Sequence, residues 1–150
     1  MPKNLQNLSL KQPRTCAIAE SISILGDKWS LLILRDMILH KKTRFKEFIS
    51  SKEKIATNIL SNRLKSLVEE RLIKKLDPLG TKKSTRYIAT DKGISSLSLI
   101  IELYLFSIDS IDESMLDESQ IYIKSQVREN RNLFEEKRKS EYLAFLEELS

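Results

Sequence analysis

The sequence predicts a mainly α-helical fold that carries one small β-hairpin. Residues 55–92 hold an amphipathic segment, a short apolar segment, a lysine-bearing turn and a second short segment rich in aromatic and β-branched residues. This order predicts helix, strand, turn, strand. Neither glycine nor proline occurs after Gly93, which predicts that the rest of the chain is helical. With 150 residues, 41% of them apolar, the chain is long enough for one small domain with a real core.

The two segments before this unit are predicted to be helices. Residues 16–25 place apolar side chains close to one helical face, and Gly26 can end that helix. Asp27 is the expected N-cap of a second helix, over residues 27–40, which has almost no polar face. A helix so apolar is expected at the centre of the core, with Trp29 as an anchor.

A brief helix and a longer one are expected to form a helix-turn-helix. Residues 46–55 form the brief helix, with Phe48 turned inward. The longer helix spans about 57–71 and buries leucines at spacings of four and three. Its opposite face carries short polar side chains that can contact base edges in a major groove, and Arg63 is expected to contact guanine or phosphate. The alternative is a merely solvated face, which would more often carry Glu and Lys. The predicted contacts on the helix are Thr57, Asn58, Ser61, Asn62, Arg63 and Lys65.

Residues 72–76 and 85–89 are the predicted hairpin strands. The turn between them contains Lys82 and Lys83, which are expected to hold DNA phosphates. We assign Arg44 and Arg86 to the same DNA-binding surface.

The charge is divided between the two halves of the chain. Residues 1–92 contain 20 Lys and Arg against 9 Asp and Glu, whereas residues 93–150 contain 6 against 12. The basic half is expected to attract an anionic polymer, with an affinity that falls as salt rises. On the count alone, a solvated lysine-rich surface is the alternative.

Residues 91–106 are predicted to form one helix, capped by Thr90. It has more apolar surface than a small domain would bury, which suggests a partner helix from a second subunit. Packing against the chain's own tail is the alternative. The side chains assigned to this dimer interface are Ile94, Leu97, Ile100, Ile101, Tyr104 and Leu105.

The last segment is expected to extend the helical part. Residues 107–119 suggest a connector, and residues beyond them one or two amphipathic helices that pack on the preceding helix and enlarge the dimer interface. A mobile acidic tail is the alternative. The predicted organisation is an arm (1–13), a DNA-binding domain (14–92) and a dimerisation region (93–150). The candidate buried positions of the extension are Ile121, Val127, Phe134, Tyr142, Phe145, Leu146 and Leu149.

The residue content disfavours an enzyme. Cys16 and His40 are the only residues of their types, so neither a structural zinc site nor a Ser/His/Asp arrangement is supported, and no phosphate-cradling glycine-rich loop exists. We expect no cofactor and no metal. Residues 1–12 lack the apolar stretch of a secretory signal, and no apolar run approaches the ~18 residues of a membrane span, so a cytoplasmic location is expected.

In combination these segments resemble the HxlR-type winged helix-turn-helix transcriptional regulators, which are related in fold to the MarR regulators. The resemblance spans roughly residues 14–106. The matching residues are Cys16-x-Ile18, Leu25-Gly26-Asp27-Lys28-Trp29-Ser30-Leu31-Leu32-Ile33-Leu34-Arg35, Arg44-Phe45-x-Glu47-Phe48, Ile55, Leu60-Ser61-x-Arg63-Leu64-Lys65-x-Leu67 and Tyr87-x-x-Thr90-x-Lys92-Gly93.

The resemblance implies a homodimeric, sequence-specific bacterial regulator. Each subunit would place its recognition helix in a major groove of a roughly palindromic operator, with the wing (77–84) on the phosphate backbone. It also implies that Cys16 is a candidate sensor of oxidants or electrophiles. The alternative for Cys16 is a buried cysteine that acts as a small hydrophobic residue. A small molecule is a further candidate effector. A winged-helix module that docks protein without reading bases is the competing function.

Two departures from the family pattern carry expectations of their own. Ala56 stands where many relatives have a capping serine, so we expect Thr57 to act as the cap and to shorten the recognition helix by one residue. The wing lacks the prolines of relatives but keeps the positive charge, so phosphate contact is expected and insertion into the minor groove is not.

Overall fold

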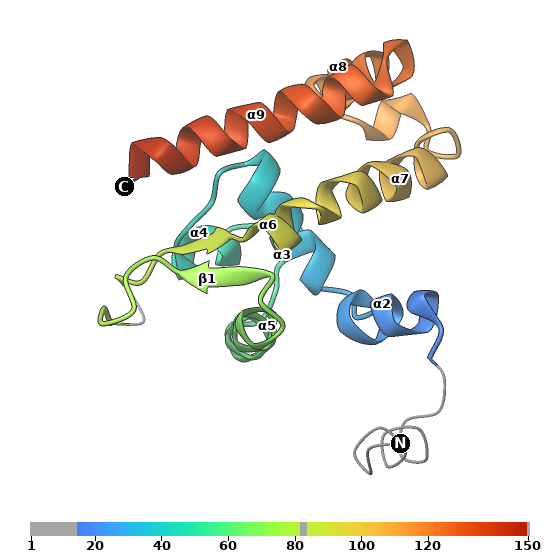
Figure 1. Cartoon of the computed structure of the whole chain (residues 1–150). Coiled ribbons are helices and arrows are strands. Elements are labelled where there is room, and N and C mark those ends of the chain that lie inside the picture. The colour runs from blue at the N-terminus through green and yellow to red at the C-terminus, as the bar shows by residue number, and fades with distance from the viewer. Residues whose placement is uncertain (1–14, 82–83, 150) are drawn as a thin grey trace, which may run out of the picture.

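The computed structural model describes residues 15–81 and 84–149 and confirms a mainly helical fold with one two-stranded hairpin (Figure 1). In chain order the elements are α2 (Ala17–Leu25), α3 (Ser30–Leu39), α4 (Phe45–Ile49), α5 (Thr57–Glu69), β1 (Ile73–Lys75), β2 (Tyr87–Ala89), α6 (Asp91–Ile94), α7 (Ser96–Ile108), a 3-10 turn (Glu113–Met115), α8 (Glu118–Glu129) and α9 (Arg131–Leu149).

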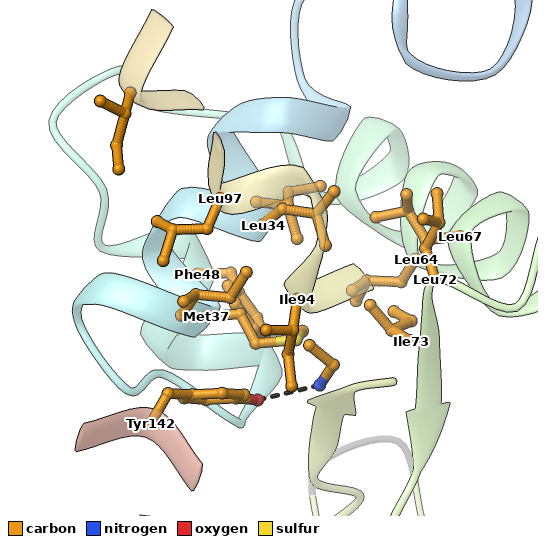
Figure 2. Packing of buried hydrophobic residues seen from close by; sticks show 14 of the residues in the cluster. Leu34, Met37, Phe48, Leu64, Leu67, Leu72, Ile73, Ile94, Leu97 and Tyr142 are labelled. Atoms are coloured by element: carbon orange, nitrogen blue, oxygen red, sulfur yellow. Dashed lines mark hydrogen bonds between the residues drawn. The ribbon is translucent and has the colours of Figure 1, made fainter. Parts of the chain in front are cut away.

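Helix α3 runs through the centre of the molecule, as its apolar sequence predicts. Its side chains Leu34 and Met37 are fully buried and lie among residues from α4, α6, α7 and the hairpin (Figure 2). Trp29 is half-buried at the start of this helix and packs against the same cluster. The predicted N-cap is wrong, because Trp29 occupies the N-cap position of a helix that begins at Ser30. Asp27 closes the turn before it, since its Oδ1 accepts hydrogen bonds from the amides of Trp29 (2.8 Å) and Ser30 (2.9 Å).

The hairpin is antiparallel and shorter than predicted. Ile73 pairs with Ala89 and Lys75 with Tyr87. The chain before α4 joins its edge, because the Tyr87 amide donates to the Thr43 carbonyl at 2.8 Å and Arg44 forms an isolated bridge with Arg86. The hairpin is thereby attached to the helix-turn-helix on one side.

The predicted continuous helix over residues 91–106 is interrupted. Thr90 caps its start as predicted, since its hydroxyl oxygen accepts from the Gly93 amide at 3.2 Å. The chain then forms the single turn α6 and restarts after Ser95 as α7. A short helix therefore turns the chain from the hairpin into the longer helix α7.

The C-terminal extension folds back over the core. Figure 1 shows α9 crossing above α3 and α7, and α8 and α9 form a helical pair. Val127, Phe134 and Tyr142 are buried as predicted, whereas Ile121 is 42% exposed, which corrects its predicted burial. Within the described ranges no helix is long and apolar enough to cross a membrane.

The position of α9 corrects part of the predicted dimer interface. Ile94, Leu97 and Ile101 are at most 4% exposed and belong to the core of their own chain. They cannot present a surface to a second subunit, so their assignment to the dimer interface is wrong. For these three residues the alternative prediction, packing within the chain, holds. The other three predicted positions, Ile100, Tyr104 and Leu105, are half-buried against the same core.

Candidate nucleic-acid interface

The candidate recognition helix α5 is fixed by its apolar face. Leu60, Leu64 and Leu67 are each at most 2% exposed, and they lie at the spacings of four and three expected for one side of a helix. The opposite side is therefore held toward solvent. Four of the predicted contact residues lie exposed on α5: Thr57, Asn58, Asn62 and Lys65.

Ser61 differs from these four. It is half-buried, and its hydroxyl oxygen is enclosed without a hydrogen-bond partner among the described residues. It lines a cavity of about 530 Å³ between α5 and the hairpin, together with Phe45, Leu64 and Tyr87. The hairpin therefore covers the side of the helix on which Ser61 lies, which corrects the expectation that this hydroxyl is presented outward.

Arg63 is half-buried and engaged by side chains of its own chain. Its Nη1 lies 3.3 Å from Asp27 Oδ2, and its Nη2 donates to Asn62 Oδ1 at 2.7 Å and to Ser66 Oγ at 3.2 Å. Burial opposes the ionisation of Asp27, but hydrogen bonds from Ser30 and Trp29 and the charge of Arg63 outweigh it and lower its pKa. The Arg63 guanidinium thus links α5 to the start of α3.

The start of α5 differs from the predicted cap. Ala56 occupies the N-cap position with extended backbone angles of φ −70° and ψ 147°, and no side chain caps the helix. Thr57 is the first helical residue, so the expectation that it acts as the cap is wrong. This end of α5 is compatible with an approaching phosphate, because helix N-termini favour negative charge.

The two predicted arginines hold the base of the wing. Arg86 makes a bidentate ion pair with Asp77, with Nε–Oδ2 and Nη2–Oδ1 distances of 2.8 and 2.9 Å. Its hydrogen bond is the main cause of the lowered pKa of the Asp77 carboxyl. Arg44 Nη1 donates to the Ser84 carbonyl at 3.0 Å, while Glu47 accepts from the Arg44 amide at 2.9 Å. The Arg44 guanidinium therefore fixes the wing relative to α4, whereas the Arg86 guanidinium joins the two sides of the hairpin. Lys82 and Lys83 lie outside the described residues.

Cys16 lies outside the helix-turn-helix and the hairpin, at the N-cap of α2. It is exposed at the N-terminal end of α2, and backbone hydrogen bonds from Ala19 and Ile18 lower the pKa of its thiol. The alternative of a buried cysteine is therefore excluded for the isolated chain. A lowered pKa favours the thiolate, which is the reactive form.

Two functional features of this surface were missed from the sequence. The resemblance includes both Asp27 and Arg63, but neither spacing nor residue type predicts that they pair across 36 positions. The enclosure of Ser61 by the hairpin was missed as well, because helical periodicity places Ser61 at the border of the polar face and cannot show what covers that border.

Comparison with known proteins agrees with this geometry. Residues 24–115 match the family model described as HxlR-like helix-turn-helix. YvaP of Bacillus subtilis (strain 168), an uncharacterised HTH-type transcriptional regulator, is 29% identical over 109 residues, which make up 72% of this chain and all of that protein. PA1607, described as a candidate transcription factor, has a crystal structure that is 34% identical with a TM-score of 0.58, over 69% of this chain and 70% of that one. A MarR-family regulator candidate from Porphyromonas gingivalis W83 is 25% identical with a TM-score of 0.54, over 67% and 97% of the respective chains.

Proposed function

This chain belongs to the HxlR-like helix-turn-helix family and is a transcriptional regulator of that type, and we propose that it binds a specific, roughly palindromic DNA site as a homodimer. One observation carries the proposal: Thr57, Asn58, Asn62 and Lys65 are exposed on α5, while the leucines of its other face are anchored in the core. A helix held in this way can enter a major groove with its polar side chains toward the bases.

The wing is proposed to lie on the flanking phosphate backbone. Its base is fixed by Arg44 and Arg86. The described part of the turn, residues 77–81 and 84, lies at the end of the hairpin (Figure 1). Lys82 and Lys83 lie in this turn and supply the positive charge that phosphate contacts need. In this arrangement α5 reads sequence and the wing adds affinity that does not depend on sequence.

Substitutions should separate these two roles. Asn62→Ala is expected to relax the base preference at one operator position. The double change Lys82→Ala and Lys83→Ala should instead weaken binding to all sequences alike. It should also reduce the slope of log affinity against log salt by about two, at roughly one per lost phosphate contact. Electrophoretic mobility shifts across a salt series, with DNA from upstream of the protein's own gene, measure both effects.

Two outcomes contradict the proposal in different ways. If the two variants lose affinity and specificity identically, the division of roles is wrong. If wild-type protein forms no salt-sensitive complex with any duplex, the DNA-binding function itself fails and the protein-docking alternative takes its place.

The dimer is proposed to use apolar side chains that the chain leaves exposed. Leu99, Leu103 and Phe106 are 40%, 47% and 86% exposed and lie at spacings of four and three on α7. Ile18 and Ile22, spaced by four on α2, are 71% and 63% exposed. Exposed apolar side chains grouped on helix faces are typical of an interface with another subunit.

Charge introduced on this surface should prevent dimer formation. The double change Leu103→Glu and Phe106→Glu is expected to give a folded monomer by analytical ultracentrifugation, because two carboxylates would have to be desolvated in the interface. Leu143→Glu is the matched control, since Leu143 is 41% exposed on α9, outside the proposed interface. A wild-type protein that sediments as a monomer, or a double variant that remains dimeric, contradicts this surface.

We also propose that DNA binding responds to electrophiles or oxidants through Cys16. The exposed thiol with a lowered pKa supports this proposal, and its N-cap position puts a modification at the start of the helix that carries Ile18 and Ile22 of the proposed interface. Treatment with a quinone is expected to add one adduct by mass spectrometry and to lower operator affinity at least about tenfold, equal to about 1.4 kcal/mol. Cys16→Ser should bind the operator with unchanged affinity and be insensitive to the quinone. An adduct on Cys16 that leaves affinity unaltered argues against sensing.

A further inference from the structure

We propose that Arg63 is a positioning residue that sets the base preference of Asn62, an inference that rests on the proposed DNA-binding function. Arg63 binds the amide oxygen of Asn62 and leaves the amide nitrogen as the group available to a base. The bound base is therefore one with acceptors on its major-groove edge, and we infer guanine rather than adenine.

The first step of the argument is the geometry at Asn62. Its Oδ1 accepts from Arg63 Nη2 at 2.7 Å, and the Asn62 residue is exposed. A bidentate contact with adenine requires the amide oxygen to accept from N6 while the amide nitrogen donates to N7. A guanidinium already bound to that oxygen occupies one of its two lone pairs and places a positive charge beside the partly positive hydrogens of adenine N6, which disfavours this second donor. Guanine presents two acceptors, O6 and N7, to which the amide nitrogen can donate.

The second step is that Arg63 is itself held in place. Its Nη1 lies 3.3 Å from Asp27 Oδ2 and its Nη2 donates to Ser66 Oγ at 3.2 Å. Asp27 is fixed in turn, because its Oδ1 accepts from the amides of Trp29 and Ser30. The side chains of Arg63 and Asp27 are 26% and 28% exposed. The orientation of Asn62 is thus set by the junction between α2 and α3, which does not itself belong to the recognition helix.

The third step is that the planar fork of arginine is needed. One guanidinium nitrogen reaches Asp27 and the other reaches Asn62 and Ser66. A lysine ammonium keeps the positive charge but is a single donor centre on a flexible chain, so it does not reproduce two separated contacts. Charge and orientation can therefore be separated by substitution.

The test is selection of bound sequences from a random pool of duplex DNA, carried out with full-length wild type, Asn62→Ala, Arg63→Lys, Arg63→Met and Lys65→Met. Asn62→Ala identifies the operator position that Asn62 contacts. At this position wild type is expected to prefer guanine to adenine by about tenfold. Arg63→Met and Arg63→Lys should each reduce this ratio toward one or invert it, because the amide oxygen of Asn62 becomes available to adenine N6. Lys65→Met is the matched control, since it also removes one positive charge from α5 and should weaken binding without changing the preferred base at the Asn62 position.

Loss of folding is distinguished by thermal unfolding of each variant and by a second substitution. Asp27→Asn keeps a carbonyl oxygen for the amides of Trp29 and Ser30 but removes the charge that holds Arg63. Asp27→Asn should shift the preference toward adenine, as Arg63→Met does. If the Asp27–Arg63 ion pair had only a structural role, the affinity for every sequence would fall equally.

The outcomes separate this inference from the proposed function. If wild type enriches no sequence, the DNA-reading function fails and the inference fails with it. If wild type enriches a site but prefers adenine at the Asn62 position, or if Arg63→Met keeps the wild-type preference, Arg63 does not position Asn62 and the DNA-binding function stands. A shift toward adenine in both Arg63 variants and not in Lys65→Met supports the inference.

Discussion

Tyr142→Ala is expected to lower the free energy of unfolding by about 3–5 kcal/mol, the range typical of a buried aromatic side chain replaced by alanine. Tyr142 is 0% exposed, and α9 places its ring against the central core cluster (Figure 2). Its hydroxyl oxygen accepts a hydrogen bond from the Ala89 amide at 2.9 Å, so the hydroxyl also satisfies a backbone donor of strand β2. The substitution would therefore leave both a cavity and an unpaired buried amide.

The hydroxyl can be tested separately from the ring. Tyr142→Phe keeps the packing but leaves the Ala89 amide without an acceptor, which should cost about 1–3 kcal/mol. Tyr122→Phe is the matched control, because Tyr122 is 56% exposed on α8 and the same change should alter stability by less than about 0.5 kcal/mol. Urea denaturation of the three variants measures these values. Equal stabilities of Tyr142→Phe and Tyr122→Phe would contradict a role for the Ala89 hydrogen bond.

The same side chain gives a pH-dependent readout. Burial raises the pKa of Tyr142 to about 12, from an ordinary value of 10.0. Because the folded state holds the phenolic proton more tightly than the unfolded state does, this contribution to stability is complete below pH 10 and is lost as the pH rises from 10 toward 12. Tyr142→Phe should lack that part of the alkaline loss of stability.

Gly93→Ala is the second substitution with a large expected effect. A Cβ at this position would lie 2.0 Å from the Leu72 carbonyl oxygen and 3.0 Å from its carbon. The contacting atoms belong to the backbone, and three hydrogen bonds hold this turn against residues 70–72. The Thr90 amide donates to the Leu72 carbonyl (3.0 Å) and the Thr90 hydroxyl donates to the Arg71 carbonyl (2.5 Å). The Lys92 ammonium donates to the Glu70 carbonyl (3.1 Å). The clash can be relieved only by separating α6 from the end of α5.

We expect Gly93→Ala to destabilise the protein by about 3 kcal/mol, at the upper end of the usual range for an overpacked site. For a chain of this length the melting temperature should fall by about 6–12 °C, which differential scanning calorimetry can measure. Ser95→Ala changes an exposed residue two positions later and should stay within about 0.5 kcal/mol of wild type. A Gly93→Ala protein that melts with the wild type would show that the close approach to Leu72 is not required.

Periodicity was sufficient to predict the elements whose apolar face is filled by the chain's own core. Leu60, Leu64 and Leu67 follow this rule, and from them the exposure of Thr57 and Asn58 follows. The start of α5 at Thr57 was predicted, but the N-cap position of Ala56 and the break at Ser95 were not, because the backbone of one turn depends on tertiary contacts such as that of Gly93 with Leu72. A residue pattern that is local in sequence contains no information on these contacts.

The interface surfaces were predicted less completely, for a similar physical reason. Helix α7 is apolar on nearly all sides, so its sequence does not show which side the rest of the chain covers. In the structure Leu97 is buried and Phe106 is exposed. On α5 the polar face was predicted correctly for Asn62 and Lys65, but the hairpin encloses Ser61 and Asp27 engages Arg63. In both cases a segment distant in sequence decides what an otherwise regular helix leaves open.

The hydrogen bond between Ala89 and Tyr142 joins residues 53 positions apart, and this separation has a consequence for synthesis on the ribosome. At about 5–20 residues per second, the strand that carries Ala89 leaves the ribosome roughly 3–10 s before its acceptor does. During that interval α5 has been synthesised and α9 has not, so the apolar side chains that Tyr142 covers are expected to be exposed. The hydrophobic core is therefore expected to close only after α9 has been synthesised.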